Sequence, residues 1–152
     1  MNSHLQLLLE KSLSENEINN FNIKRLSKTA TTEYLQISFN LEYLNNKEIL
    51  MDLFIVDNTV AHSVISAFVS TEKHNKYYTL ELINNLNTAF KGTLCFVLDK
   101  DGKMDILNEC FSGNGSPLEL CKQITNYILF LTSDCKNVLY DICLLYTSDA
   151  AD

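Results

Sequence analysis

The sequence predicts a single α+β domain in which helices pack on an antiparallel β-sheet. Segments that alternate apolar and polar residues are joined by short turns rich in Asn and Asp, as in hairpin-linked strands. Two segments with helical periodicity begin at N-cap residues. The chain has 152 residues, of which 46% are hydrophobic, and this suits one compact domain. We expect the order α-β-β-β-β-α-β-β-α within a single domain over residues 1–142.

The N-terminal segment predicts a short amphipathic helix over residues 3–13. Ser3 and Gln6 form a capping-box pattern ahead of a leucine-rich stripe. The following residues, Ser14–Leu26, leave two alternatives open. They can extend the helix, or they can form a short strand that alternates around Ile23, which is the alternative we favour.

The strongest strand pattern in the chain lies at Tyr34–Tyr43, where five apolar residues alternate with four polar ones. A period of two places the apolar set on one face of a sheet. Two further strands, Ile49–Val56 and Thr59–Val69, follow turns at Asn45–Lys47 and Asp57–Asn58. Three successive hairpin-linked strands predict an antiparallel meander.

The last strand of this meander, Thr59–Val69, is expected to place Val60, Val64 and Phe68 on one face. His62 shares the face of Val60 and Val64. We interpret His62 as a half-buried structural histidine, because no histidine stands at metal-ligand spacing from a cysteine.

A helix is predicted over Asn75–Phe90, with Asn75 as its N-cap. Its expected buried stripe is Leu80, Ile83, Leu86 and Phe90. The segments Thr93–Leu98 and Met104–Phe111 then predict two strands that are joined by a turn at Asp99–Lys103.

The last helix has the most complete start signal in the chain, with Ser116 at N-cap, Pro117 at N1 and Glu119 at N3. We expect one continuous helix. Its expected apolar stripe is Leu118, Cys121, Ile124, Ile128, Leu131, Cys135 and Leu139.

The two ends of the chain call for separate interpretation. Residues 143–152, CLLYTSDAAD, resemble one reading frame of a transposon-derived sequencing adapter over the whole decapeptide. We expect this tail to be an artefact and the natural C-terminus to lie near Ile142 or to be missing, so the tail is left out of the fold prediction. At the start, no basic region precedes an apolar stretch, so we expect no secretory signal.

Charge argues against nucleic acid as a partner. Twelve Lys and Arg residues stand against nineteen Asp and Glu residues, a formal net charge of −7, whereas phosphate binding needs clustered cations. No apolar run reaches the roughly 18 residues that a membrane helix needs, so we expect no membrane partner.

Five cysteines without a C-x-x-C pair are typical of reduced thiols in the cytoplasm. A disulfide between Cys110 and Cys121 is the alternative.

Each candidate for catalysis or metal binding has a structural explanation. Asp99–Gly102 fits neither register of an EF-hand loop, so we interpret it as a hairpin turn. A nucleophilic Cys95–His62 pair is conceivable across a sheet, but Cys95 lies in an apolar, core-like segment. The loop Gly113–Ser116 lacks the lysine of a phosphate-binding loop. We therefore predict no catalytic residue, no cofactor and no metal.

Three features of the C-terminal half occur together in a known family. They are the leucine- and asparagine-rich segment Leu82–Asn87 followed by Phe90, the Asp99–Gly102 turn between two strands, and the Ser-Pro start of a long final helix. This arrangement resembles the YbjN family, small bacterial proteins with a type III secretion chaperone-like fold. The resemblance covers Leu80–Ile142.

The resemblance implies a noncatalytic cytoplasmic protein, a sensory transduction regulator or chaperone-like protein that binds other proteins and often forms a homodimer. A client strand could add to an exposed sheet edge. Asn84, Asn87 and Phe90 are the residues that we expect to touch a partner. Two alternative functions stay open: an immunity-type or phage-encoded inhibitor, and a small thiol-dependent hydrolase or transferase.

Overall fold

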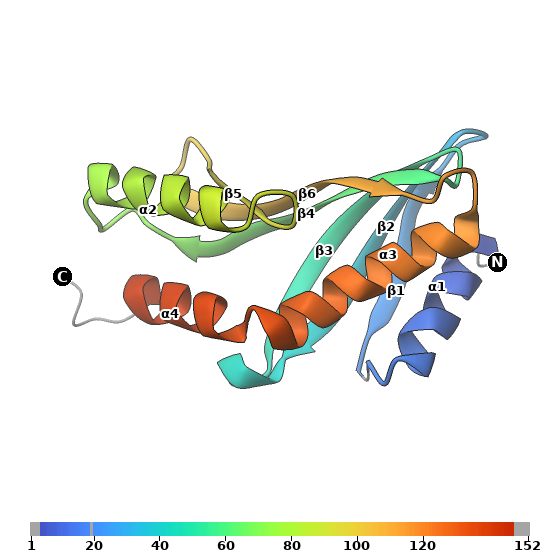
Figure 1. Cartoon of the computed structure of the whole chain (residues 1–152), viewed down its shortest axis with the longest axis horizontal. Coiled ribbons are helices and arrows are strands. Elements are labelled where there is room, and N and C mark those ends of the chain that lie inside the picture. The colour runs from blue at the N-terminus through green and yellow to red at the C-terminus, as the bar shows by residue number, and fades with distance from the viewer. Residues whose placement is uncertain (1–3, 19, 148–152) are drawn as a thin grey trace.

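The computed structural model describes residues 4–18 and 20–147, apart from the side chains of residues 109, 110 and 147. Over these residues the chain forms four α-helices and one six-stranded antiparallel sheet (Figure 1). The elements in chain order are α1 (His4–Glu15), β1 (Asn22–Lys28), β2 (Thr32–Leu41), the 3-10 helix η1 (Glu42–Leu44), β3 (Lys47–Val56), β4 (Val60–Ser70), α2 (Lys76–Ala89), β5 (Cys95–Leu98), β6 (Lys103–Ser112), α3 (Pro117–Leu129), the π-helical turn η2 (Phe130–Asp134) and α4 (Lys136–Thr147). The predicted α+β class with an antiparallel sheet is confirmed.

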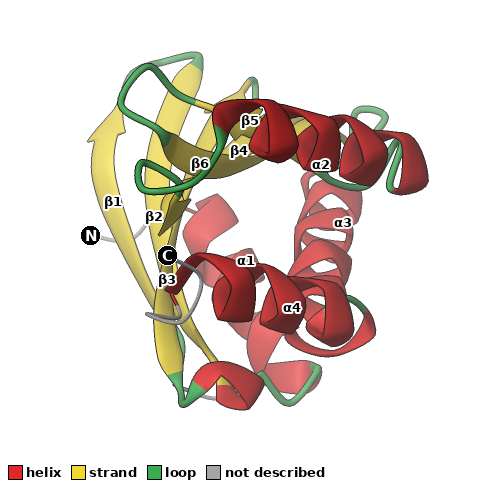
Figure 2. Ribbon diagram, turned by 90° about the vertical axis from the view of Figure 1, so that its left-hand side faces the viewer, coloured by secondary structure: helices red, strands yellow, loops and turns green. Residues whose placement is uncertain are grey.

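The strands lie in the order β1-β2-β3-β4-β6-β5. Strands β1 to β4 form a meander, and the β5–β6 hairpin joins it through β6, which pairs with β4. The sheet is curved, with α1, α3 and α4 on its concave side and α2 running beside β5 (Figures 1 and 2). In the described part of the chain, the convex side is not covered by a helix.

One row of apolar side chains crosses all six strands. Its members are Ile23, Ile37, Met51, Ile65, Ile106 and Phe96, in order from β1 to β5. Each of them is at most 7% exposed, and they share one hydrophobic core with the inward stripe of α3. Burial of this row against the helices therefore fixes which face of every strand points inward.

The uncertain segment after α1 forms a strand, as we favoured. Ile23 of β1 is buried, and Gln6 of α1 donates a hydrogen bond of 3.2 Å from its Nε2 to the Ile23 carbonyl. Ser3, the predicted capping residue, lies outside the described residues.

The turns that join the first strands follow the predicted chemistry. Asn45, Asn46, Asp57 and Asn58 all have φ between 53 and 58°. Asn and Asp adopt this left-handed region more readily than other residues with a side chain. Positive φ at both Asp57 and Asn58 is typical of a type I′ hairpin turn, which matches the twist of paired strands.

The predicted N-caps of α2 and α3 are confirmed. The Asn75 side chain accepts the N–H of Tyr78 at 3.0 Å, and Ser116 Oγ accepts the N–H of Glu119 at 3.2 Å. These bonds satisfy N–H groups that the first turn of a helix leaves without an internal partner.

The predicted buried stripes were wrong at one position in each helix. Leu80 of α2 is 42% exposed, because Thr79 takes the buried position instead. Leu118 of α3 is 51% exposed, since it lies in the first turn, while Leu120 is fully buried. Periodicity shows that a helix has an apolar stripe, but the neighbouring element decides where burial begins.

The predicted face of β4 was also wrong. Val60 is 43% exposed and His62 is exposed, whereas Phe68 is buried. The pairing with β6 shifts register between Ile65 and Val69, and Ala67 in between has φ 53°. The Ala67 N–H donates to Asp105 Oδ1 at 2.8 Å, which holds this bulge. Such a bulge inverts the alternation along the strand.

The last helix is divided rather than continuous. The π-helical turn η2 separates α3 from α4, and the Cys135 N–H donates to the Phe130 carbonyl five residues earlier, at 3.0 Å. Helix α4 continues to Thr147 and so extends past the predicted boundary at residue 142. Tyr146 is buried, with its hydroxyl 2.8 Å from Thr79 Oγ1. The adapter origin of residues 143–152 stays a prediction.

A buried carboxylate lies on the concave face of β2. The Glu33 side chain is 1% exposed, and neither of its oxygens has a hydrogen-bond partner. Lys28 Nζ lies 3.8 Å from Glu33 Oε1 across the β1–β2 hairpin. Lys28 is therefore the cation that compensates this carboxylate.

Lys28→Met should lower the free energy of unfolding by about 2 kcal/mol, less than the roughly 3–5 kcal/mol typical of fully buried pairs, because the lysine is partly exposed. Lys11→Met, which removes the exposed pair with Glu15, should change it by less than about 0.5 kcal/mol. Urea denaturation of both variants measures the difference. Equal effects would show that Lys28 does not compensate Glu33.

Candidate functional site

An aromatic row lies on the convex, helix-free face of the sheet. Tyr34 of β2 pairs with Phe54 of β3, and Phe54 pairs with His62 of β4. The ring centroids are 4.5 Å apart in the first pair and 4.9 Å apart in the second. Their sequence neighbours Leu35, Leu53 and Ser63 are buried, so the three rings point to the opposite, outward side of the sheet.

Exposed aliphatic side chains extend this row into a larger apolar surface. Leu50 and Val56 of β3 are 46% and 42% exposed, and Val60 of β4 is 43% exposed. Val56 and Val60 pair with each other beside the aromatic row. Clustered apolar side chains on a helix-free face are a mark of an interaction surface, whereas isolated ones are ordinary.

The surface has few charges. The outward positions of β2, β3 and β4 extend from the row of Thr32, Val56 and Val60 to the Ser38–Leu50 pair. Asp52 is the one acidic residue among these positions. Gln36 Nε2 donates to Asp52 Oδ1 at 3.1 Å. Burial, a hydrogen bond with Asp52 and its negative charge raise the pKa of Tyr34 above its ordinary value. Asp52 is thus held by its neighbours within an otherwise neutral face.

The edge of the sheet at β5 is closed by a side chain. Asn87 of α2 donates from Nδ2 to the Phe96 carbonyl at 2.9 Å and accepts the Phe96 N–H on Oδ1 at 2.7 Å. The amide thus takes the place of a neighbouring strand. A client strand could pair here only by displacing Asn87.

The opposite edge, at β1, carries different protection. The Gln6 side chain donates a hydrogen bond to the Ile23 carbonyl, and the pairing of β1 with β2 shifts register between Arg25 and Ser27. Lys24 and Arg25 are exposed beside this irregularity. Bulges and positive charges are common means of discouraging strand addition at an edge.

The three residues that we expected to touch a partner do not form one exposed patch. Asn84 is exposed on α2, while Asn87 is engaged with β5. Phe90 is half-buried and packs edge-on against Phe130, with ring centroids 6.4 Å apart. The contacts found for Asn87 and Phe90 are internal, and a partner contact of the three residues stays a prediction.

The aromatic row was missed at the level of sequence, although one signal was present. Tyr34 is in phase with Gln36 and Ser38, so an aromatic residue stands in the polar set of an alternating strand. Its two ring neighbours come from other strands and depend on the register of pairing.

The candidate thiol and calcium sites are not assembled. Strand β6 lies between Cys95 on β5 and His62 on β4. The predicted hairpin turn is confirmed: Asp99 Oδ1 accepts the N–H groups of Asp101 and Lys103, and Gly102 has φ 78°. Among the described residues, no group of three or more His, Cys, Asp or Glu is placed to hold a metal ion.

The buried thiols show no sign of activation. Cys121 and Cys135 are buried free thiols, and burial raises the pKa of each to about 11. A raised pKa leaves the thiol protonated, and the thiolate is the nucleophile. Cys121 is a free thiol, and the alternative Cys110–Cys121 disulfide involves a side chain, that of Cys110, which lies outside the described residues.

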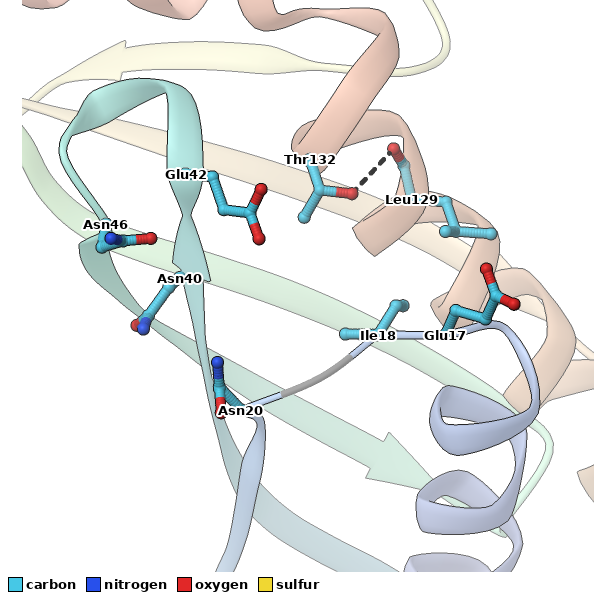
Figure 3. A pocket seen from close by; sticks show the side chains of 8 residues that line it. All are labelled: Glu17, Ile18, Asn20, Asn40, Glu42, Asn46, Leu129 and Thr132. Carbon is cyan, nitrogen blue, oxygen red and sulfur yellow. Dashed lines mark hydrogen bonds between the residues drawn. The ribbon is translucent and has the colours of Figure 1, made fainter.

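A polar cavity of about 220 Å³ lies where the end of α1, the end of β2 and the end of α3 approach one another (Figure 3). Its lining residues are Glu17, Ile18, Asn20, Asn40, Glu42, Asn46, Leu129 and Thr132. Thr132 Oγ1 donates to the Leu129 carbonyl at 3.1 Å. Carboxylate, amide and hydroxyl side chains line this cavity, and its one hydroxyl among the described lining residues, that of Thr132, is engaged with the helix backbone.

Comparison with protein-family models, curated proteins and solved structures finds no match. The resemblance to the YbjN family therefore stays a prediction. Within the described residues, none of the helices combines the length and the apolarity needed to cross a membrane.

Asn87→Ala should destabilise the protein by about 2 kcal/mol, because two main-chain groups of the edge strand lose their hydrogen bonds. Asn84→Ala, on the same helix but exposed, should change stability by less than about 0.5 kcal/mol. Chemical denaturation of both variants checks this. If the two variants lose equal stability, Asn87 does not hold the β5 edge.

Stability should fall as the pH rises from about 9 to about 11, because the folded protein keeps the Cys121 proton where the unfolded chain releases it. Cys121→Ala should reduce this fall by about 1–2 kcal/mol at pH about 10.5. Urea denaturation between neutral and alkaline pH gives both slopes. Parallel slopes for variant and parent would contradict the raised pKa.

Proposed function

We propose that the protein is a noncatalytic, cytoplasmic protein-binding protein of the YbjN-like, chaperone-like type, and that it binds its partner through the helix-free sheet face. The observation that carries this proposal is the row of Tyr34, Phe54 and His62, with exposed Leu50 and Val56 beside it. Burial of apolar surface is the main favourable term in protein association, at roughly 25 cal/mol per Å².

The face is a better candidate than the sheet edges. Asn87 occupies the main-chain groups of Phe96 at one edge, and Gln6 occupies the Ile23 carbonyl at the other. A partner that packs on the face needs none of these groups. Binding by side-chain packing therefore fits this fold better than strand addition.

The face also suits a protein partner rather than a small molecule. The aromatic and aliphatic side chains lie side by side across three neighbouring strands of an open sheet face. Small ligands favour concave pockets that bury most of their surface, whereas protein interfaces are broad and have apolar centres with aromatic side chains.

A photo-crosslinking amino acid at position 50 should form discrete protein adducts in an extract of the producing cells, because Leu50 lies within the proposed binding face. The same amino acid at position 80 provides the matched control, since Leu80 is exposed to a similar degree, 42% against 46%, but lies on α2. Adducts resolved by electrophoresis and mass spectrometry give the readout. Equal labelling at both positions, or none at position 50, would contradict the proposal.

A further inference from the structure

We infer that the partner of the helix-free face is a basic protein that presents an arginine or lysine side chain in the middle of an apolar patch, opposite Asp52. This inference rests on the proposed function, because it names the chemistry of the partner that the same face binds. It is carried by the central position of Asp52 on the face and by the lack of a counter-charge for it among the described residues.

Asp52 lies in the centre of the apolar face. Its neighbours along the outward side of β3 are Leu50 and Phe54, two residues before and two residues after it. Its neighbours across the sheet are Gln36 on β2 and Val64 on β4. Three of these four neighbours are apolar. A partner that packs on Leu50 and Phe54 therefore covers the Asp52 carboxylate as well.

The carboxylate has no cation of its own in the described part of the chain. Gln36 donates a hydrogen bond of 3.1 Å to Asp52 Oδ1, but its amide is neutral. Lys24 on β1 pairs with Gln36 and so lies two strands from Asp52, about 10 Å away. None of the ion pairs among the described residues includes Asp52, which is half-buried before any partner binds.

Covering this carboxylate requires a positive charge from the partner. A carboxylate that loses its water without gaining a cation strongly opposes association. An arginine or lysine of the partner supplies the cation, and an ionised carboxylate has acceptor sites beyond the one that Gln36 uses. Of the two cations, the guanidinium suits apolar surroundings better, because it is more weakly hydrated than an ammonium.

The charge of the whole chain favours the same class of partner. A net charge of −7 attracts basic proteins and repels acidic ones, a second copy of this chain included. In such a complex the apolar side chains around Asp52 contribute burial, and the ion pair fixes the orientation of the partner.

A competition experiment with the crosslinking variant at position 50 tests the inference. Purified full chain without the crosslinking amino acid competes for the partner, and the concentration that halves the adduct is measured. Asp52→Asn keeps the acceptor for Gln36 but removes the charge, so at least about 10-fold more of this competitor should be needed. Glu81→Gln, the same charge change at an exposed position of α2, should compete within about 3-fold of the parent. A circular-dichroism spectrum and a denaturation curve verify that each variant is folded.

The direction of the Asp52→Asn effect decides between two kinds of partner. If apolar groups alone cover Asp52, removal of its charge removes a desolvation cost, and the variant should compete as well as the parent or better. That result would overturn the inference. Lys24→Gln tests whether the chain's own lysine moves onto Asp52, and it should compete within about 3-fold of the parent. A loss equal to that of Asp52→Asn would overturn the inference too.

The crosslinked partner gives a direct measurement. Mass spectrometry of the adduct locates the contact on the partner, and the nearest arginine or lysine there is replaced by glutamine. Calorimetric titration of the purified proteins should show at least about 10-fold weaker binding of this partner variant to the parent chain, but no more than about 3-fold weaker binding to Asp52→Asn. Equal losses against both chains would contradict an ion pair with Asp52.

The outcomes separate this inference from the proposed function. Without a discrete adduct at position 50, the proposed function fails and the inference fails with it. Adducts for which Asp52→Asn competes undiminished keep the binding face and overturn only the cationic partner. An adduct with the mass of two copies of this chain also overturns the inference, because the partner is then acidic.

Discussion

The structure depends on a single apolar row that runs through every strand of the sheet. Its members, from β1 to β5, are Ile23, Ile37, Met51, Ile65, Ile106 and Phe96. All are buried beneath the helices. Because side chains alternate along a strand, a slip of one residue in any pairing would move that strand's apolar set to the convex face. The row therefore determines the other face as well: Tyr34, Phe54 and His62 become neighbours as a consequence of the register that buries the core.

The two faces and the two edges of the sheet differ in what covers them. Helices cover the concave face, and an asparagine or glutamine side chain occupies main-chain groups at each edge. Side-chain amides suit this role because each offers both a donor and an acceptor, as a neighbouring strand does. Protected edges discourage further strand pairing. The convex face, with its apolar and aromatic side chains, is the remaining sheet surface in the described part of the chain.

This arrangement bears on how the predicted partner-binding residues are understood. Asn87 lies near the apolar stripe of its helix, where the sequence pattern does not distinguish a partner contact from an internal one. The structure shows an internal contact, because α2 runs beside β5 and brings the amide within 2.9 Å of Phe96. Proximity in space, rather than residue type, decides the role.

Local patterns by themselves determined the elements of this protein. The alternation in β2, the left-handed Asn and Asp turns and the N-caps at Asn75 and Ser116 each involve residues a few positions apart, and each is present in the structure. The interactions that stabilise these features lie within one turn or one strand, so the features can be predicted from the sequence.

Tertiary structure alone decided the features that join distant segments. The bulge at Ala67 requires Asp105, 38 residues away, and the exposure of Leu80 depends on where α2 meets the sheet. The pairing of Phe54 with its two aromatic neighbours follows from strand register, and the closure of the β5 edge follows from the position of Asn87. Such contacts gain their free energy from groups that only the folded chain brings together, so spacing along the sequence does not encode them.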